Sequence, residues 1–462
     1  MADLLSILSS ASTSLSAQRA VLATAGHNID NANTPGYSRQ IASLEAVTPA
    51  EQVNGAYIGR GATLTTVTQA RDRFLEAQIP RALGDAGFSS AEAQALQAFH
   101  GLDVTDAGGL DSAISGFYSG LRALAQNPGD SSLRASFLGA AQTLARTFNS
   151  TASAVESARS GLDAKASGLT GEIDREAQAV AGLNVQIRQA RASGAEPNDL
   201  LDLRQQHLDK LAELAGTTTV PTSEGDVNVT LTGGVALVAG GHAASLSTTP
   251  DGSGHLAVQI TPPGGAPATL PSSALGGSLG GTLAARDGAL KAAGDQLDQF
   301  AFDLASAVNV VHQAGYGLDG SHGLDLFTVS ATPSGAASQL SVAITDHAQL
   351  ATAGAGGGAG DSSNAHLLVE TETQGLGTSG KDVQSTLSAI VSQFGSSTAS
   401  AKAFADQDGA IKTHLTGLRD SYSGVSIDEE MVTMQQAQRG YEAIAKVMQV
   451  ADKMLETLLN LR

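Results

Sequence analysis

The sequence predicts a mainly α-helical protein with a β-rich insert, organised as nested, discontinuous domains. Three observations favour this fold class. Apolar residues recur every seven positions at both ends of the 462-residue chain, heptad spacing also runs through residues 150–190, and the apolar period changes to alternation at Thr217. A period of seven is typical of coiled-coil helices, whereas a period of two is typical of strands.

The first thirty residues carry two interleaved heptad sets. Most positions between them are Ser, Thr or Ala, which let neighbouring helices approach closely. The pattern predicts a helix with a coiled-coil seam over residues 1–30. The first set is Leu8, Leu15, Leu22 and Ile29, and the second set is Leu4, Ala11, Gln18 and Ala25.

Residues 28–40 are expected to end this helix. Asn31 and Asn33 favour turn conformations. Pro35 forces the residue before it into extended backbone, and Gly36 permits a reversal of the chain. The segment therefore predicts a helix end, a turn and an extended stretch.

The middle of the chain is expected to consist of helices around one β-rich region. Apolar alternation on both sides of Gly233-Gly234 predicts a hairpin with a two-residue turn, and residues 256–260 predict another strand. Extended segments are expected over residues 41–80, and short strands and loops over 324–372. Helices are expected near 72–79, over 90–150 with breaks at 108–109 and 127–130, and over 150–190, 198–215, 286–314, 381–394 and 400–418.

The last 35 residues repeat the pattern of the first thirty. Ser426 and Glu429 form a capping-box signature, and three acidic residues load the first turn, where the helix dipole favours them. The pattern predicts a second coiled-coil helix over residues 428–462. Its seam residues are Met434, Ala437, Tyr441, Ile444, Met448, Ala451, Leu455 and Leu458.

These terminal helices allow two interpretations: ordinary amphipathic helices packed on a globular body, or a paired coiled coil that projects from it. The strict period of seven and the position at both extremes favour the pair. Burial of the seam side chains alone stabilises the pair by less free energy than the backbone entropy lost when both helices become ordered. We therefore expect the ends to order fully only when neighbouring subunits bury their other faces.

Composition excludes several classes of protein. The chain has 26 Lys and Arg against 45 Asp and Glu, a net charge of −19, which disfavours nucleic acid as a partner. It has no cysteine, which excludes disulfides and cysteine-based metal sites. We expect no cleavable signal peptide, because the first basic residue is Arg19, and no membrane association, because no apolar stretch approaches 18 residues.

No motif predicts catalysis, a cofactor or a metal site. Residues 375–381 approach a phosphate-binding loop, but Asp382 replaces the Ser or Thr that would hold magnesium. The ten histidines show no metal-ligand spacing. We therefore expect a protein that is not an enzyme.

Several segments resemble the bacterial flagellar axial family of rod, hook and hook-associated proteins, and the resemblance spans most of the chain. Residues 423–431 are similar to the segment that opens the last helix of this family, and 126–134, 198–204 and 279–283 also agree. The sequence at 37–40 is most similar to the hook-associated members. The N-terminal family motif comprises Asn28, Asn31, Asn33, Thr34, Pro35, Gly36, Tyr37, Ser38 and Arg39.

This resemblance implies a structural subunit of the flagellum that joins hook to filament at the hook–filament junction. It implies secretion, unfolded, through the flagellar type III apparatus. The implied partners are further copies of the chain, the hook protein, the second hook–filament junction protein and an export chaperone that acts near the C-terminal helix.

The implied layout has three layers. The terminal coiled-coil axial core would consist of residues 1–55 and 408–462. The helical rod would consist of residues 56–215 and 282–407. The outer β-rich domain would consist of residues 216–281.

A second interpretation stays open, in which the β-rich insert of a secreted axial-type protein carries an enzymatic or adhesive activity. Asp226, His242, Asp251 and His255 lie in this insert without a recognisable spacing. Deletion of residues 216–281 separates the two interpretations, because a structural subunit would still support some swimming.

Overall fold

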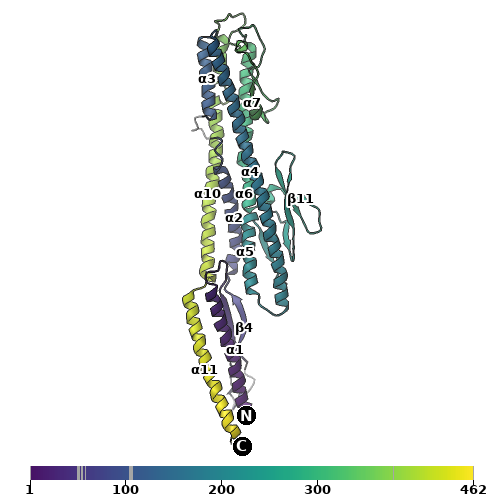
Figure 1. Ribbon diagram of the computed structural model, residues 1–462, viewed down its shortest axis with the longest axis vertical. Coiled ribbons are helices and arrows are strands. Elements are labelled where there is room, and N and C mark those ends of the chain that lie inside the picture. Colours follow the sequence, from purple (N-terminus) through teal and green to yellow (C-terminus); the bar gives the residue numbers. More distant parts are fainter. Residues whose placement is uncertain are drawn as a thin grey trace.

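The computed structural model describes residues 2–48, 52–53, 56–57, 59–102, 108–377 and 379–460. The molecule is elongated, and both ends of the chain lie at the same tip (Figure 1). Helices α1 (Ala2–Asp30) and α11 (Ile427–Asn460) lie side by side at this tip. The antiparallel hairpin of β1 (Gln40–Ala46) and β4 (Ala62–Gln69) packs beside α1. The mainly helical class with small sheets is confirmed.

The rod above this tip is built from long helices that begin at well-defined caps. The carboxylates of Asp72, Asp130 and Asp382 each accept backbone N–H groups of the first turn that follows, which satisfies donors that a helix leaves unpaired. The rod helices are α2 (Arg73–Gln97), α3 (Leu110–Gln126), α4 (Ser131–Ala192), α5 (Asn198–Ala215), α6 (Gly277–Ala285), α7 (Lys291–Ala314) and α10 (Val383–Ser423).

Two helices are longer than the sequence predicts. The predicted break at 127–130 is confirmed, but α4 then continues without interruption for 62 residues. α10 also runs unbroken through Gly395, where two separate helices were expected. The hydroxyls of Ser397 and Thr398 donate to the carbonyls of Gln393 and Phe394 one turn earlier, so this polar stretch bonds within the helix rather than ending it.

The β-rich insert packs against one side of α4 (Figure 1). The predicted hairpin is present, although its loop has three residues, 232–234, closed by a hydrogen bond from Leu231 N to Val235 O. The first sheet has the order β5-β6-β7-β8 and the second β11-β10-β9. The strands are β5 (Thr218–Pro221), β6 (Val227–Thr230), β7 (Ala236–Ala239), β8 (His242–Ala243), β9 (Ser245–Pro250), β10 (Leu256–Thr261) and β11 (Ala268–Thr269).

Short elements fill the remaining connections. The described region 324–372 contains two short α-helices and a 3-10 helix besides the expected strands. A π-helical turn, η2, joins α6 to α7. These short elements are β2 (Gln52–Val53), β3 (Ala56–Tyr57), η1 (Ser272–Ala274), η2 (Arg286–Leu290), β12 (Phe327–Thr328), α8 (Ala336–Gln339), β13 (Ser341–Val342), η3 (His347–Gln349) and α9 (Ser363–Glu370).

The hydrophobic cores lie in the rod and the insert. The rod core gathers around aromatic side chains such as Phe117, Phe137 and Phe300. A second core joins α4 and α5 to both sheets of the insert. Within the described residues, neither α1 nor α11 contributes a side chain to a core cluster. The terminal helices are therefore stabilised differently from the rest of the protein.

Glycines permit the closest helix contacts in the rod. A side chain at Gly281 would collide with the backbone carbonyl of Phe88 in α2, and one at Gly87 with the carbonyl of Glu213 in α5. This contact explains why the segment 279–283 has two adjacent glycines inside a helix, where glycine is otherwise unfavourable.

The predicted domain limits remain a prediction, and two of them fall inside continuous helices. Residue 408 lies within α10, and the limit between 281 and 282 lies within α6. The connection between α10 and α11 spans only residues 424–426.

One buried arginine connects the α3–α4 loop to the loop before α9. Arg134 is fully buried, and it donates to Pro128 O at 2.5 Å and Leu350 O at 2.9 Å, and to Thr352 Oγ1 at 2.5 Å. Burial lowers the pKa of this guanidinium, although Asp319 acts in the opposite direction. The side chain thus replaces the water that these acceptors would otherwise require.

Arg134→Met is expected to destabilise the rod by about 3 kcal/mol, because it removes the hydrogen bonds to the buried Pro128 O, Leu350 O and Thr352 Oγ1, of which Leu350 O keeps only Thr352 N as a donor. Urea unfolding followed by circular dichroism measures this change. The matched control is Arg146→Met, an exposed arginine on the same helix, for which we expect a change within about 0.5 kcal/mol. Equal effects of the two substitutions would contradict this role for Arg134.

Candidate assembly site

The predicted seam residues of both ends are brought together by the packing of α1 on α11. Their smallest members are buried: Ala11 is 7% exposed, Ala25 is 1% exposed, and Ala437 and Ala451 are each 3% exposed. The two helices also approach closely where Gln18 of α1 packs against Gly440 of α11. A Cβ atom at position 440 would lie within 3.4 Å of the Gln18 amide. The two helices therefore meet through small residues.

The larger seam side chains are only partly covered in the isolated chain. They are intermediate in exposure, neither buried nor fully exposed. Leu458 lies within α11, but its side chain is outside the described residues. The partly covered seam residues are Leu4, Leu8, Leu15, Gln18, Leu22, Ile29, Met434, Tyr441, Ile444, Met448 and Leu455.

The side of α11 that borders its seam exposes further apolar side chains. About half of each of these side chains is exposed: Val432 53%, Val447 50%, Val450 53% and Met454 54%. At 100° per residue they fall within one narrow stripe of the helix. The terminal pair thus has an apolar surface that it cannot bury on its own.

The family motif lies where the terminal pair meets the rod, and Asn28 is its centre. This side chain is 1% exposed. Its Nδ2 donates to Gln40 O at 2.8 Å, while its Oδ1 accepts from Gln40 N at 2.9 Å and from the Tyr37 hydroxyl at 2.8 Å. The amide therefore fixes the end of α1 to the start of β1.

Within the motif loop, Asn31 and Gly36 set the turn. Asn31 Nδ2 donates to His27 O at 3.0 Å, and Thr34 Oγ1 donates to Asn31 Oδ1 at 3.2 Å. Gly36 has φ +75, and a side chain there would collide with Gln206 of α5. Gln206 Nε2 donates to Pro35 O at 2.9 Å, so the loop is held directly against the rod.

Ser38 connects the loop to α5 through a buried carboxylate. Asp202, which is 5% exposed, accepts from Ser38 N at 3.1 Å and from Ser38 Oγ at 2.7 Å. The same carboxylate accepts from Arg71 at 2.8 Å, and Arg71 also pairs with Glu76 at 3.0 Å. This network joins the motif to the first turns of both α5 and α2.

Arg39 connects the loop to the two C-terminal helices. Its Nε donates to Glu430 Oε1 at 2.6 Å and its guanidinium to Glu429 at 3.2 Å, both in the first turn of α11. Its backbone N–H donates to Ser423 O, the last residue of α10, at 2.8 Å. Glu430 is 3% exposed, and a buried carboxylate is destabilising unless it is paired, so the pairing with Arg39 stabilises the start of α11.

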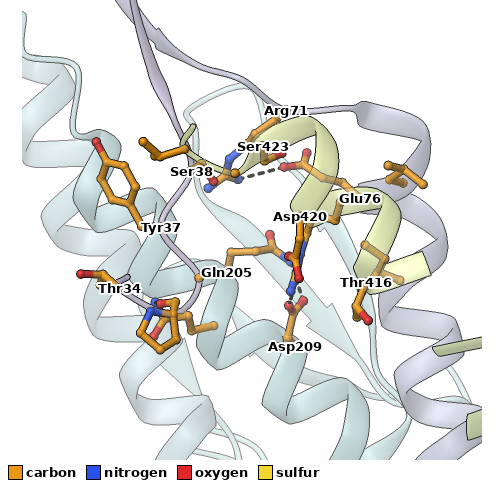
Figure 2. Close-up of a pocket in the computed structure, with 18 of the residues that line it drawn as sticks. Thr34, Tyr37, Ser38, Arg71, Glu76, Gln205, Asp209, Thr416, Asp420 and Ser423 are labelled. Atoms are coloured by element: carbon orange, nitrogen blue, oxygen red, sulfur yellow. Dashed lines mark hydrogen bonds and ion pairs between the residues drawn. The ribbon is translucent and has the colours of Figure 1, made fainter. Parts of the chain in front are cut away.

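These contacts surround a cavity of about 550 Å³ between the motif loop, α2, α5 and the α10–α11 connection. Figure 2 shows Thr34 and Tyr37 on one side, with Asp420 and Thr416 across from them. Arg419 donates to Asp209 of α5 at 2.7 Å and holds the end of α10 in place. Burial, together with Asp199, Asp202 and Glu430, raises the pKa of the Tyr37 hydroxyl, which keeps it protonated as a donor to Asn28.

Most of the acidic and histidine residues that could support an activity of the β-rich insert make structural contacts instead. Asp226 pairs with Arg188 of α4, and His255 Nδ1 lies 3.0 Å from Asp163 Oδ2, also on α4. Asp251 accepts from the backbone N–H groups of Ser253 and His255 and closes a turn. Three of the four candidate side chains therefore bind the insert to the rod or shape its loops, whereas His242 is exposed.

The described residues contain no cluster of three or more metal-ligating side chains. Asp382, which follows the glycine-rich stretch 375–381, caps α10 by accepting from Ser385 N at 2.7 Å. Thr378 of that stretch lies outside the described residues. In the described part of the chain, no helix combines the length and apolar content needed to cross a membrane.

Sequence reasoning missed the partners of the family motif. Asp202 lies within a family-like segment but had no predicted role, and Glu430 was expected to complement the helix dipole rather than to pair with Arg39. Arg71, Gln206 and Ala17, which is 2% exposed on α1, gave no signal at all. Asp202 lies on the polar side of α5, at least 120° from Leu208 and Leu211 at 100° per residue, so the sequence pattern did not indicate its burial.

Comparison with known proteins shows what the chain is similar to. Residues 102–327 match the model of the flagellar hook-associated protein FlgK helical domain, and residues 420–461 match that of the flagellar basal body rod FlgEFG protein C-terminal region. Flagellar hook-associated protein 1 of Bacillus subtilis strain 168 is 29% identical, over 98% of this chain and 97% of that protein. The chain is similar to flagellar hook-associated protein 1 along nearly its whole length.

Further members of the hook-associated protein 1 family align along their whole length. The Escherichia coli K12 protein is 24% identical over 99% of this chain and 100% of its own. The solved structure of the flagellar hook junction protein FlgK from Burkholderia pseudomallei has a TM-score of 0.69 at 19% identity, and it covers 76% of this chain and 100% of that one. This last similarity concerns the fold alone.

Proposed function

We propose that this chain is a non-enzymatic structural subunit of the bacterial flagellum that joins the hook to the filament. Similarity to hook-associated protein 1 over nearly the whole chain supports this proposal. The observation that carries the mechanism is the incomplete burial of the terminal pair. Its apolar surface is left open in one molecule and becomes buried when copies assemble.

In this proposal, α1 and α11 form the axial core as a coiled-coil pair. The seam positions at Leu15 and Ile444 and the exposed stripe around Val447 supply the contacts between subunits, because burial of half-exposed apolar side chains is the main driving force of association. The small buried residues set the distance between the two helices. Assembly then adds the apolar burial that the isolated pair lacks.

The family motif acts in this mechanism as the joint between axial core and rod. Asn28, Ser38 and Arg39 contact β1, α5 and α11 respectively, so the joint fixes both terminal helices relative to the rod. We place the limit of the axial core at residues 424–426 rather than at 408, because α10 continues to Ser423 as part of the rod. The β-rich insert lies to the side of the rod and forms the outer domain.

The partners follow from the same position. Copies of this chain, the hook protein and the second junction protein would contact the axial core and rod, and an export chaperone would cover the C-terminal helix before assembly. The exposed apolar stripe of α11 supports such a chaperone, because a large exposed apolar surface promotes aggregation unless it is covered. Export through the flagellar type III apparatus places the chain at the hook–filament junction.

Removal of the gene tests this function directly. We expect cells that have hooks but no filaments and that release flagellin into the medium, and we expect the intact chain to restore filaments. Electron microscopy of the flagella and an assay of flagellin in the medium measure both results. Normal filaments in the deletion strain would contradict the proposal.

A further inference from the structure

A second apolar surface lies on α10, outside the terminal pair and the joint. Phe404, Ile411 and Leu418 are spaced by seven residues and are 59%, 44% and 41% exposed, and Tyr422 is 56% exposed one turn after Leu418. α10 lies along one long edge of the molecule (Figure 1). No other part of the described chain buries these side chains.

Small and uncharged residues accompany this row. At 100° per residue, the exposed residues in the arc of about 140° that holds this row include no Lys, Arg, Asp or Glu, and the exposed Asp406 and the partly exposed Asp408 border the arc on its two sides. We call this surface the α10 neutral face. It consists of Ala403, Phe404, Gln407, Ala410, Ile411, His414, Gly417, Leu418, Ser421 and Tyr422.

The charged residues of α10 lie elsewhere on the helix. Lys412 pairs with Glu213 at 3.0 Å and Arg419 with Asp209 at 2.7 Å, and both partners are on α5. Lys402 pairs with Asp406 along the helix. The two ion pairs with α5 therefore fix the inner side of α10 to the rod and leave the neutral face toward solvent.

We propose that the α10 neutral face binds a neighbouring copy of this chain in the assembled junction. This inference rests on the proposed function. Copies of a chain with a net charge of −19 repel one another. Electrostatic repulsion between two copies is weakest where they meet through uncharged surfaces. A partner of opposite charge would instead be expected to meet a charged surface.

The position and the size of the face agree with this occupant. Only residues 424–426 separate α10 from α11, so a copy that contacts α11 also lies next to α10. The face is about 27 Å long and about 10 Å wide, roughly 300 Å². A stable pairwise interface needs about 800 Å² from each partner. The contact is therefore too small to pair free molecules, and it forms once the terminal helices hold copies together.

Photo-crosslinking in assembled flagella tests this contact. p-Benzoylphenylalanine is placed at Ile411 of the full chain, which replaces the native copy in the cell, and isolated hook–junction structures are irradiated. We expect crosslinks between copies of this chain, and we expect none when the same labelled protein is irradiated as a dilute monomer. The same label at Val447 reports independently on assembly through α11.

The outcomes separate the two proposals. If Val447 crosslinks copies to one another while Ile411 gives no crosslink, or gives one only to the hook protein or the second junction protein, the α10 contact is overturned and the proposed function stands. If the labelled chain restores motility but is absent from the junction, the proposed function fails, and the α10 contact fails with it.

A substitution pair adds a measurement independent of the label. Ile411→Asp is expected to lower the amount of chain retained in isolated junctions roughly tenfold relative to Ile411→Leu. Both variants should unfold at the same temperature as the native monomer, because Ile411 is nearly half exposed. Equal retention of the two variants would overturn the contact.

Discussion

Leu15→Asp and Ile444→Asp are expected to block incorporation into flagella while the isolated chain stays folded. Both residues lie in the seam of the terminal pair and are only partly covered in one molecule. The cores that stabilise the rod and the insert contain neither residue. The cost of the new carboxylate therefore falls on the assembled state.

The expected size of this effect follows from burying a charge between subunits. At about 2 kcal/mol or more for each contact, the association constant falls at least roughly 30-fold. Immunoblotting of purified flagella measures incorporation, and thermal unfolding followed by circular dichroism measures the monomer. The matched controls, Leu15→Met and Ile444→Leu, keep the apolar volume and should assemble normally. Global unfolding of the Asp variants would show instead that the terminal helices belong to the monomer core.

Arg39→Met is expected to release the start of α11 from the rod. The substitution leaves the nearly buried carboxylate of Glu430 without its cation, which costs about 2–3 kcal/mol of local stability, after allowance for the partial exposure of Arg39. Amide exchange in the first turns of α11 should become roughly 30- to 150-fold faster, while exchange in α4 stays unchanged. Incorporation into flagella should fall as the angle between axial core and rod is lost.

A double substitution distinguishes an ion pair from general damage. Glu430→Met added to Arg39→Met removes the unpaired charge, so the exchange rates should return toward the native values. Arg19→Met, an exposed arginine of α1, serves as the control and should leave exchange in α11 unchanged. Additive effects of the Arg39 and Glu430 substitutions would contradict a direct coupling between the two side chains.

The sequence predicted local features well, because their signals lie within a few residues. The break at 127–130 depends on the cap at Asp130, and the hairpin in the insert depends on alternation around two glycines. The false break near Gly395 has the same origin, because a Gly-Ser-Ser sequence is typical of loops while the helix around it supplies the missing stability.

The candidate site could be predicted only in part. Both heptad patterns were visible, and the structure places them side by side, but the partial exposure of their large residues depends on three-dimensional packing. The joint depends on contacts between residues far apart in the chain, such as Ser38 with Asp202 and Arg39 with Glu430. Such contacts leave no periodic pattern in a single sequence. The motif could be located from its sequence, whereas its partners required the structure.

Hydrogen exchange of the terminal helices, measured residue by residue in the dilute monomer and in assembled junctions, tests the central claim most directly. We predict that α4 is protected in both states, whereas the parts of α1 and α11 farthest from the joint exchange rapidly in the monomer and become protected on assembly. Full protection of both helices in a monomer that shows no tendency to associate would contradict the account.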